Sequence, residues 1–273
     1  MGFLTDLVGT IRRELDERPL PLEALDAAAR SQPPARSLRE ALRGATVPAV
    51  IAEVKRSSPS AGWIDVDADA GSLARAYEAG GAAAISVLTE PRHFGGSLAD
   101  LRLVRATAGI PVLRKDFLID PDQLVEARAA GADSVLLIAA CLDDGLLDRM
   151  LTAARALGME PLLETHSNRD LERALATDAE IIGVNARDLE TLEVDFPAAL
   201  ERLRSIPSDR VAALESGIAS HADVAAAVAA GASAILVGEA LMRSADAAAA
   251  IAGLIRGPGL AARGQSLDEE GIA

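Results

Sequence analysis

The phrase EAGGAAAIS at residues 78–86 returns as AAGADSVLL at residues 129–137 and as AAGASAILV at residues 229–237. Each copy has the pattern of a helix end, a capping glycine, a tight turn and a buried strand. A weaker copy, ATDAEIIGV, lies at residues 176–184. Repeated helix–turn–strand segments are typical of parallel βα units, because a parallel strand needs a crossover helix to bring the chain back.

Short aliphatic runs recur along the whole chain, separated by stretches rich in Ala, Leu, Arg and Glu. We expect eight strands, at residues 47–55, 82–89, 111–116, 134–139, 160–165, 181–185, 211–216 and 234–238. Nearly continuous apolar runs are typical of parallel strands that are covered on both faces. Eight βα units in 273 residues predict an α/β protein with a (β/α)8 TIM barrel. A doubly wound open sheet is the alternative, but no strand is followed by a GxGxxG loop.

Two segments flank the predicted barrel, which we place at residues 47–256. Residues 1–46 contain helical patterns in FLTDLVGTIRREL, LEALDAAARS and SLREALRG, so we expect an N-terminal helical extension that packs on the barrel. Residues 257–273 are polar and rich in glycine. We expect them to form a mobile C-terminal tail.

Composition excludes several partners and chemistries. The chain has 41 acidic and 27 basic residues and a formal charge of −14, which argues against nucleic acid and anionic membranes as partners. One cysteine and three widely spaced histidines rule out a disulfide framework and disfavour a metal site. The sequence shows no secretion signal and no apolar run that could span a bilayer. We therefore expect a cytoplasmic protein.

Charged side chains gather at the predicted carboxyl ends of strands, where barrel enzymes place their chemistry. Glu53 and Lys55 end the first strand and face the same way, because strand side chains alternate. Lys115, Glu164 and Glu215 end the third, fifth and seventh strands. Burying such charges is costly unless they pair or serve a ligand. Salt bridges on a solvated rim explain one strand end, but not so many at once.

The last strand ends have the pattern of an anion site. The sixth strand ends in Asn185, with Arg187 just beyond it, and the last two end in SGI and VGE, which contain Gly217 and Gly238. Glycine lets backbone N–H groups approach a ligand closely. In barrels the loops after strands seven and eight often hold a phosphate. The sequence therefore predicts a phosphorylated small-molecule substrate.

The remaining reactive side chains have structural interpretations. We expect Cys141 to be a small buried residue, because no histidine lies near it in sequence. His93 is expected at the surface and His221 at the start of a helix. His166 is expected to order a loop or to cap the next helix.

The stretch IAEVKRSSPSAG at residues 51–62 closely resembles the first-strand signature of the indole-3-glycerol phosphate synthase family. The similarity continues, in order, through AISVLTEPRHFGGSLADL, PVLRKDFLIDPDQLVEARAAGADSVLLIAA, GVNARDLETLEVD, ESGI and VGEALMR. It covers residues 33–243. The EVKxSSPS and LRKDF segments are specific to this family among barrels, whereas ESGI and VG are not. The family also carries extra helices before its barrel.

The resemblance implies a carboxy-lyase of tryptophan biosynthesis that acts on 1-(2-carboxyphenylamino)-1-deoxyribulose 5-phosphate. The ring carbon that bears the carboxylate attacks the C2′ carbonyl, and carbon dioxide and then water leave to give indole-3-glycerol phosphate. The family needs neither a metal nor an organic cofactor. We expect a monomer, and the sequence leaves open a weak association with other tryptophan-pathway enzymes.

The resemblance also implies catalytic roles. Lys115 matches the general acid, and its cation would stabilise negative charge as it develops. Glu164 matches the carboxylate that accepts a proton. Lys55 matches the lysine that engages anionic groups of the substrate and is implicated in the dehydration. Which lysine protonates the departing hydroxyl stays open.

Further positions match residues that hold the substrate. Glu53, Asn185 and Glu215 match polar residues that hold the lysines, the anilino nitrogen and the sugar hydroxyls. The other substrate-binding matches are Ser58 and Pro59 of a mobile first loop, Arg187 near the substrate carboxylate, and Phe94, Phe117, Leu137 and Leu189 around the aromatic ring. The phosphate-binding turns match Ser216, Gly217, Gly238 and Glu239. Glu239 would act through its backbone N–H, because a carboxylate that faces phosphate would repel it.

Two positions depart from the usual family pattern, and two other functions compete. Trp63 occupies a loop site expected to be smaller and Thr165 one where valine is frequent, which bears on loop dynamics and turnover. Phosphoribosylanthranilate isomerase would place a cysteine and an aspartate where this chain has Lys55 and Asn185. A non-catalytic barrel that binds a phosphometabolite is disfavoured, because unused buried charges cost stability.

Overall fold

Within residues 2–45 and 48–257, which the computed structural model describes, eight parallel strands close into a barrel. Around the barrel their order is β1-β10-β9-β8-β7-β6-β5-β4. Their bounds are Ala49–Val54 for β1, Ala84–Leu88 for β4, Val112–Lys115 for β5, Ser134–Ile138 for β6, Glu160–Thr165 for β7, Ile181–Asn185 for β8, Val211–Glu215 for β9 and Ala234–Val237 for β10. The TIM-barrel prediction is confirmed, and each predicted strand contains an observed one.

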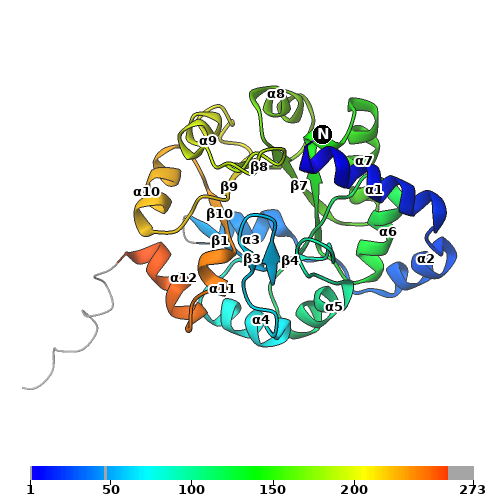
Figure 1. Cartoon of the computed structure of the whole chain (residues 1–273), viewed down its shortest axis with the longest axis horizontal. Coiled ribbons are helices and arrows are strands. Elements are labelled where there is room, and N and C mark those ends of the chain that lie inside the picture. Colours follow the sequence, from blue (N-terminus) through cyan, green and yellow to red (C-terminus); the bar gives the residue numbers. More distant parts are fainter. Residues whose placement is uncertain (1, 46–47, 258–273) are drawn as a thin grey trace, which may run out of the picture.

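Helices surround the ring of strands (Figure 1). Those that follow barrel strands are α4 (Ala70–Ala79), α5 (Leu98–Thr107), α6 (Pro121–Ala129), α7 (Asp144–Ala156), α8 (Asn168–Ala176), α9 (Phe196–Leu203), α10 (His221–Ala229), α11 (Glu239–Met242) and α12 (Ala247–Arg256), with a short 3₁₀ turn η1 at Ala139–Cys141. A small antiparallel hairpin, β2 (Ser57–Ser58) and β3 (Gly62–Trp63), lies between β1 and α4. The sequence did not predict this hairpin.

The repeated phrase builds the same turn three times. Gly81, Gly131 and Gly231 have φ of 89°, 93° and 103°, a left-handed conformation that glycine adopts without strain. In each copy the residue after this glycine donates its N–H to a carbonyl in the last turn of the preceding helix. The turn thereby ends the helix and directs the chain into the next strand.

The apolar core has two layers, because side chains along each strand alternate between the two faces of the barrel wall. Outward-facing residues such as Val50, Ile85 and Val135 pack against the surrounding helices. Inward-facing residues such as Ile51 and Leu162 fill the barrel itself. A cavity lies beyond the carboxyl ends of the strands, where the charged residues lie.

The N-terminal helices contact both ends of the barrel. Leu38 and Leu42 of α3 (Leu38–Gly44) are buried against the inward-facing residues of the amino end, and Figure 1 shows α3 across the middle of the ring. Helix α2 (Leu22–Ser31) packs along α6. Helix α1 (Phe3–Glu17) lies near the opposite, carboxyl end. The extension therefore contacts the barrel at several levels.

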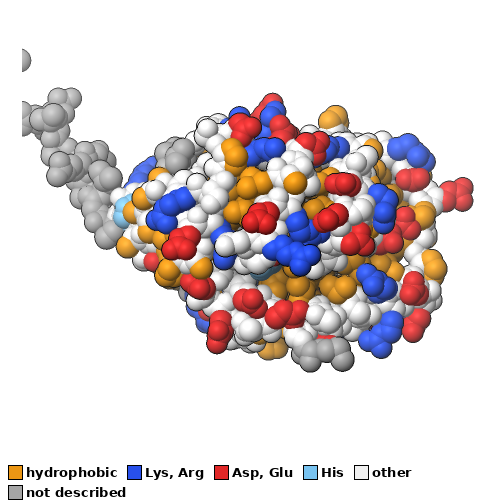
Figure 2. Space-filling view, turned by 90° about the horizontal axis from the view of Figure 1, so that it is seen from above, with side chains coloured by type: hydrophobic (Ala, Val, Ile, Leu, Met, Phe, Trp, Pro, Cys, Tyr) orange, Lys and Arg blue, Asp and Glu red, His pale blue; other side chains and the backbone are white. Residues whose placement is uncertain are grey.

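Some predictions fall on residues whose structure is not described. The boundary predicted between residues 46 and 47 falls on two of them, and the predicted tail at 257–273 lies outside the described residues except for its first residue. Helices that could cross a membrane are absent from the described part of the chain. Acidic and basic side chains are interspersed on the face shown in Figure 2.

Candidate active site

A cavity of about 490 Å³ lies at the carboxyl ends of the strands. The structure brings almost all of the predicted site residues to its wall. Those that line it are Glu53, Lys55, Ser58, Pro59, Phe94, Lys115, Phe117, Glu164, Asn185, Arg187, Leu189, Glu215, Ser216, Gly217, Gly238 and Glu239. These residues lie on five barrel strands and in the segments that follow β1, β4, β5, β8, β9 and β10, so the fold gathers them from most of the chain's length.

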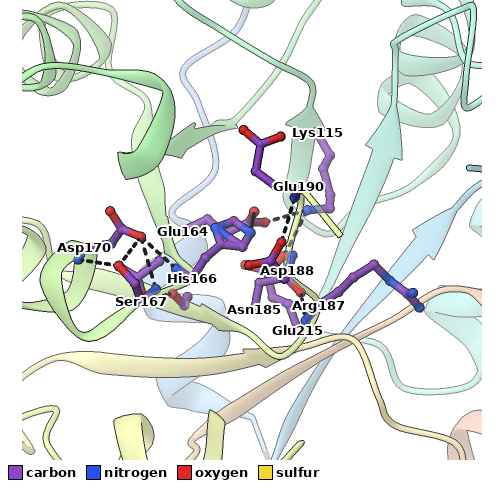
Figure 3. Close-up of polar contacts among 12 residues, drawn as sticks. Lys115, Glu164, His166, Ser167, Asp170, Asn185, Arg187, Asp188, Glu190 and Glu215 are labelled. Atoms are coloured by element: carbon purple, nitrogen blue, oxygen red, sulfur yellow. Dashed lines mark hydrogen bonds and ion pairs between the residues drawn. The ribbon is translucent and has the colours of Figure 1, made fainter. Parts of the chain in front are cut away.

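The centre of the cavity wall is a buried ionic cluster. Lys115 Nζ at the end of β5 lies 2.9 Å from Glu164 Oε2 on β7 and 3.0 Å from Glu215 Oε2 on β9 (Figure 3). Lys115 has a side chain 15% exposed, and the two carboxylates are each 1% exposed. The lysine thus bridges two carboxylates that have almost no access to water.

Burial and charge shift the pKa values of this cluster in different directions. Burial lowers the pKa of Lys115, but the carboxylates of Glu164, Glu215 and Glu53 outweigh burial and raise it above its usual value. Burial raises the pKa of Glu164, but Lys115 and His166 hold it well below the usual range. For Glu215, burial and then the charge of Glu164 raise the pKa to about 8, against the effect of Lys115. Two carboxylates side by side therefore differ in proton affinity, as acid–base catalysis needs.

A second ion pair lies on β1. Lys55 Nζ is 3.0 Å from Glu53 Oε1, and period-two alternation places both side chains on the cavity side. A Cβ added to Gly238 would lie 2.3 Å from Glu53 Oε1. Gly238 therefore makes room for the Glu53 carboxylate, in addition to its predicted place beside a phosphate.

The loop after β8 holds Asn185 and Arg187 by its own backbone. Asn185 Oδ1 accepts the N–H of Arg187 at 2.9 Å, and Arg187 Nη1 donates to the carbonyl of Leu192 at 2.7 Å. One edge of the guanidinium is thus engaged within the loop. The side chain still lines the cavity, so the remaining donors can face a substrate carboxylate.

Aromatic side chains line the cavity near the loops after β4 and β5. The rings of Phe94 and Phe117 have centroids 6.1 Å apart. Phe3 of α1 also lines the cavity and stands edge-on to Phe117 at 6.5 Å. The sequence did not predict Phe3, because nothing in a helix that precedes the barrel indicates where that helix docks.

Leu137 requires a correction. It was expected at the aromatic ring, but its side chain lies in the outer core between the strands and the helices. Leu136 and Ile138 line the cavity instead. All residues of β6 are buried, so the sequence of this strand has no polar alternation that would tell the two faces apart.

The predicted phosphate turns have unusual backbone geometry. Ser216 and Gly217 have φ of 65° and 76°, and a residue other than glycine in this region is strained, as is common at binding sites. Glu239 directs its carboxylate to Arg243, with Nη2 and Oε1 3.0 Å apart, so its side chain is engaged away from the turn. Arg243 also lines the cavity and was not predicted.

The hairpin that contains Ser58 and Trp63 is docked on the loop after β4. Ser57 donates its N–H to the carbonyl of Phe94 at 3.1 Å. Trp63 is 64% exposed and covers Gly95, where an added Cβ would lie 2.9 Å from the indole ring. Thr165, the other departure from the family pattern, is buried and donates from Oγ1 to the carbonyl of Gly183 at 2.8 Å.

The three histidines and the single cysteine differ in burial and in their hydrogen-bond partners. His221 begins α10, as predicted, and its Nδ1 lies 2.8 Å from the carbonyl oxygen of Leu254. His93 is 38% exposed at its side chain, and burial raises the pKa of Cys141. His166, expected to order a loop or to cap the next helix, lies with Nε2 2.9 Å from Glu164 Oε1. Within the described ranges, no group of three or more His, Cys, Asp or Glu side chains could hold a metal ion.

The family model and the similar proteins carry the same description. The sequence matches the family described as indole-3-glycerol phosphate synthase over residues 5–254. Proteins with that name from a Nocardioides species and from Mycobacterium avium are both 50% identical to this chain. The first match spans 253 residues (92% of this chain and 97% of the relative), and the second spans 239 residues (88% of each).

Solved structures of other proteins share the fold at low sequence identity. A thiamine phosphate pyrophosphorylase from Pyrococcus furiosus matches with a TM-score of 0.57 at 16% identity, over 80% of this chain and 96% of that one. A 3-hexulose-6-phosphate synthase matches with a TM-score of 0.59 at 21% identity, over 76% of this chain and 97% of that one. These likenesses support the barrel fold alone.

Proposed function

The chain belongs to the indole-3-glycerol phosphate synthase family, and from that premise we propose how its own residues carry out the reaction. The family's members are carboxy-lyases of tryptophan biosynthesis, and this chain is one of them. The observation that carries the assignment of roles is the position of Lys115 between two buried carboxylates.

In the first half-reaction, the ring carbon that bears the carboxylate attacks C2′ of the ribulose chain. The electron pair of the C2′ carbonyl moves to its oxygen, which takes a proton from Lys115 Nζ. Carbon dioxide then leaves, and the electron pair of the broken bond returns to the ring. A positioned general acid contributes about 10²–10⁴-fold to such a step. The low dielectric of the buried site strengthens the effect of the lysine charge.

In the second half-reaction, the C2′ hydroxyl leaves as water and a proton leaves C1′, which creates the indole double bond. Glu164 is the proposed acceptor of a proton, because Lys115 and His166 keep it ionised at neutral pH. Lys55, held by Glu53 at 3.0 Å, stands on the other side of the cavity and is the second candidate to protonate the departing hydroxyl.

The remaining predicted residues position the substrate. Glu215 Oε1 has no hydrogen-bond partner within the described parts of the chain, which leaves it free for a sugar hydroxyl. Asn185 and Arg187 would meet the anilino nitrogen and the substrate carboxylate. The aromatic ring would lie among Ser58, Pro59, Phe94, Phe117 and Leu189, and the phosphate at the turns of Ser216, Gly217, Gly238 and Glu239.

We also propose that the protein acts in the cytoplasm as a monomer, on a small phosphorylated substrate and without metal or organic cofactor. A doubly charged phosphate keeps such a substrate from crossing a membrane unaided, which supports the cytoplasmic location. One chain carries all of the charged residues predicted for the site, so a monomer would have the complete set. Association with other tryptophan-pathway enzymes would be weak, and sedimentation over a range of concentrations tests the oligomeric state.

The test is the appearance of the indole chromophore when purified protein is mixed with the carboxyphenylamino-deoxyribulose phosphate in the presence of a chelator. We expect a signal that saturates with substrate. Lys115→Met, which keeps the aliphatic length of the side chain, should reduce kcat by about 10²–10⁴-fold while calorimetry still detects substrate binding. Full turnover by Lys115→Met would contradict the general-acid role. Binding without turnover by the unmodified protein would favour a non-catalytic barrel.

A further inference from the structure

His166 stands beside the proposed base without a hydrogen bond of its own. Its side chain is 8% exposed, and Nε2 lies 2.9 Å from Glu164 Oε1. Neither ring nitrogen has an aligned hydrogen-bond partner in the described part of the molecule. A buried polar group without a hydrogen bond lowers the stability of a protein. We therefore look for the role of His166 in its contact with the Glu164 carboxylate (Figure 3).

The backbone, rather than the ring, fixes the position of His166. Its N–H lies 3.3 Å from Asp170 Oδ2, and the same carboxylate accepts the N–H and the hydroxyl of Ser167 in the capping box of α8. The end of β7 is therefore anchored to the start of α8. Because residues 164 and 166 are two apart, the extended backbone directs both side chains to the same side.

The two oxygens of Glu164 thus have different neighbours. Oε2 lies 2.9 Å from Lys115 Nζ, and Oε1 lies 2.9 Å from His166 Nε2. The other titratable groups of this corner are Lys115, Glu215, Asp170, Asp188, Glu190 and Cys141.

We propose that His166 is a positioning residue that orients Glu164 and sets how readily it accepts a proton. This inference rests on the proposed role of Glu164 as the base. With the proton on Nε2, neutral imidazole needs only a change of alignment to donate to Oε1, 2.9 Å away, which leaves Oε2 for Lys115 and the reacting atoms. When Nδ1 gains a second proton, the added positive charge stabilises the anionic carboxylate and makes it a weaker base. Protonation of the imidazole therefore lowers the rate.

Two substitutions separate orientation from charge. His166→Gln places an amide Nε2 where it can donate to Glu164 but cannot titrate. His166→Ala removes the donor and the charge together. The matched control is His221→Gln, because His221 is also partly buried, does not line the cavity, and has its Nδ1 2.8 Å from the carbonyl oxygen of Leu254 in α12.

The experiment measures kcat and KM by formation of the indole product from about pH 5 to 9 in all four proteins. His166→Ala should lose about 10- to 100-fold in kcat, which is the usual loss when a residue that orients a functional group is removed. KM should change little. His166→Gln should recover kcat near neutral pH, and its acid limb should move to lower pH. His221→Gln should keep the unmodified profile.

Every outcome decides between the claims. Unchanged kcat and an unchanged acid limb in both His166 variants would overturn this inference and leave the activity standing. An acid limb at the same pH in His166→Gln as in the unmodified protein would overturn the charge effect. Glu215 is present in every protein, so a shift of the acid limb in a His166 variant is caused by the substitution of His166. If His166→Ala does not fold, the profile of His166→Gln alone decides. Absence of product from the unmodified protein would instead reject the proposed function.

Discussion

Two buried charge clusters lie at opposite ends of the barrel and are built differently. The amino-end cluster surrounds Asp133, which is fully buried just before β6. Its Oδ1 accepts the N–H of Arg36 at 2.9 Å and lies 3.3 Å from Arg105 Nη2, and its Oδ2 accepts the N–H of Val112 at 3.0 Å. Both carboxylate oxygens are therefore paired within the protein.

The carboxyl-end cluster, formed by Lys115, Glu164, Glu215 and His166, is left incomplete. Among the described residues, Glu215 Oε1 and both ring nitrogens of His166 have no hydrogen-bond partner. Two carboxylates also share one lysine. A site that must take hold of a substrate keeps polar atoms free and accepts the cost in stability, whereas a structural cluster does not.

The comparison predicts that breaking the amino-end cluster affects stability and spares activity. Asp133→Ala leaves Arg36 and Arg105 without their carboxylate and the Val112 N–H without an acceptor. Removing one partner of a buried ionic group costs about 3–5 kcal/mol. We expect the free energy of unfolding, measured by denaturant titration, to fall by that amount. The folded fraction should keep the unmodified kcat.

Asp178→Ala provides the matched control at the surface. Asp178 pairs with Arg155 at 2.6 Å, but its side chain is 77% exposed, and exposed pairs contribute about 0–1 kcal/mol. Equal losses in the two variants would show that the burial of Asp133 is not what makes its pairing matter.

At the carboxyl end the comparison predicts a pH dependence of stability that comes from the crowded carboxylates. The pKa of Glu215 is raised from 4.5 to about 8 in the folded state, so between these values the folded chain binds more protons than the unfolded chain. The free energy of unfolding therefore falls as pH rises through this window. The side chain of Glu215→Gln cannot ionise. Between pH 5 and 8 the free energy of unfolding of this variant should therefore fall by about 1–3 kcal/mol less than that of the unmodified protein.

Denaturant titration of both proteins at several pH values measures this difference. Glu164 does not obscure this difference. Its pKa is lowered in the folded state, so its contribution to the stability of the protein is lost only as the pH falls below this window. Parallel curves for the two proteins between pH 5 and 8 would mean that Glu215 is ionised in the folded state like an ordinary carboxyl.

A third prediction tests how closely the carboxyl-end cluster is fitted. Glu215 lies over Gly183 of β8, and a Cβ there would be 2.3 Å from Glu215 Oε1. Gly183→Ala should push the carboxylate away from Lys115 and lower kcat by about 10- to 100-fold, as small displacements in a catalytic site do. Gly253→Ala is the control, since residue 253 lies in α12 with nothing within 4 Å of an added Cβ. Unchanged kcat in Gly183→Ala would mean that Glu215 has freedom to move.

The strands and the charged mouth could be predicted from the sequence because both have local signals. The turn glycines and apolar runs locate each strand, and polar residues interrupt those runs where the strands end. The hairpin β2–β3 escaped prediction because strands of two residues have no periodic pattern. Leu137 was misplaced because a strand that is apolar on both faces does not show which residues point inward.

His166 and Phe3 were missed for opposite reasons. The signal for His166 was present, since it follows Glu164 by two residues and period two places both on one face. For Phe3 there was no local signal. Its position depends on how α1 docks across the barrel mouth, where Thr5 donates to Glu190 Oε1 at 2.7 Å. Such contacts between distant segments depend on the whole fold.

Phe3 provides the smallest predicted effect, at the apolar edge of the carboxyl-end site. Its ring closes the aromatic side of the cavity against His93, at 5.0 Å, and Phe117, at 6.5 Å. Phe3→Ala should raise KM by about fivefold, which corresponds to about 1 kcal/mol of lost apolar contact for a partly buried ring. kcat should change little, because Phe3 is an apolar ring that packs on His93 and Phe117 and has no proton to transfer.

Phe3→Leu sharpens this prediction, because it keeps apolar bulk at the cavity edge and should hold KM near the unmodified value. Stability should change little in either variant, since Phe3 is only partly buried and α1 is also held by the buried Leu4 and Leu7. A large loss of stability with an unchanged KM would mean that Phe3 stabilises the fold and does not contribute to substrate binding. The N-terminal extension would then serve the barrel only structurally, at its carboxyl end as at its amino end.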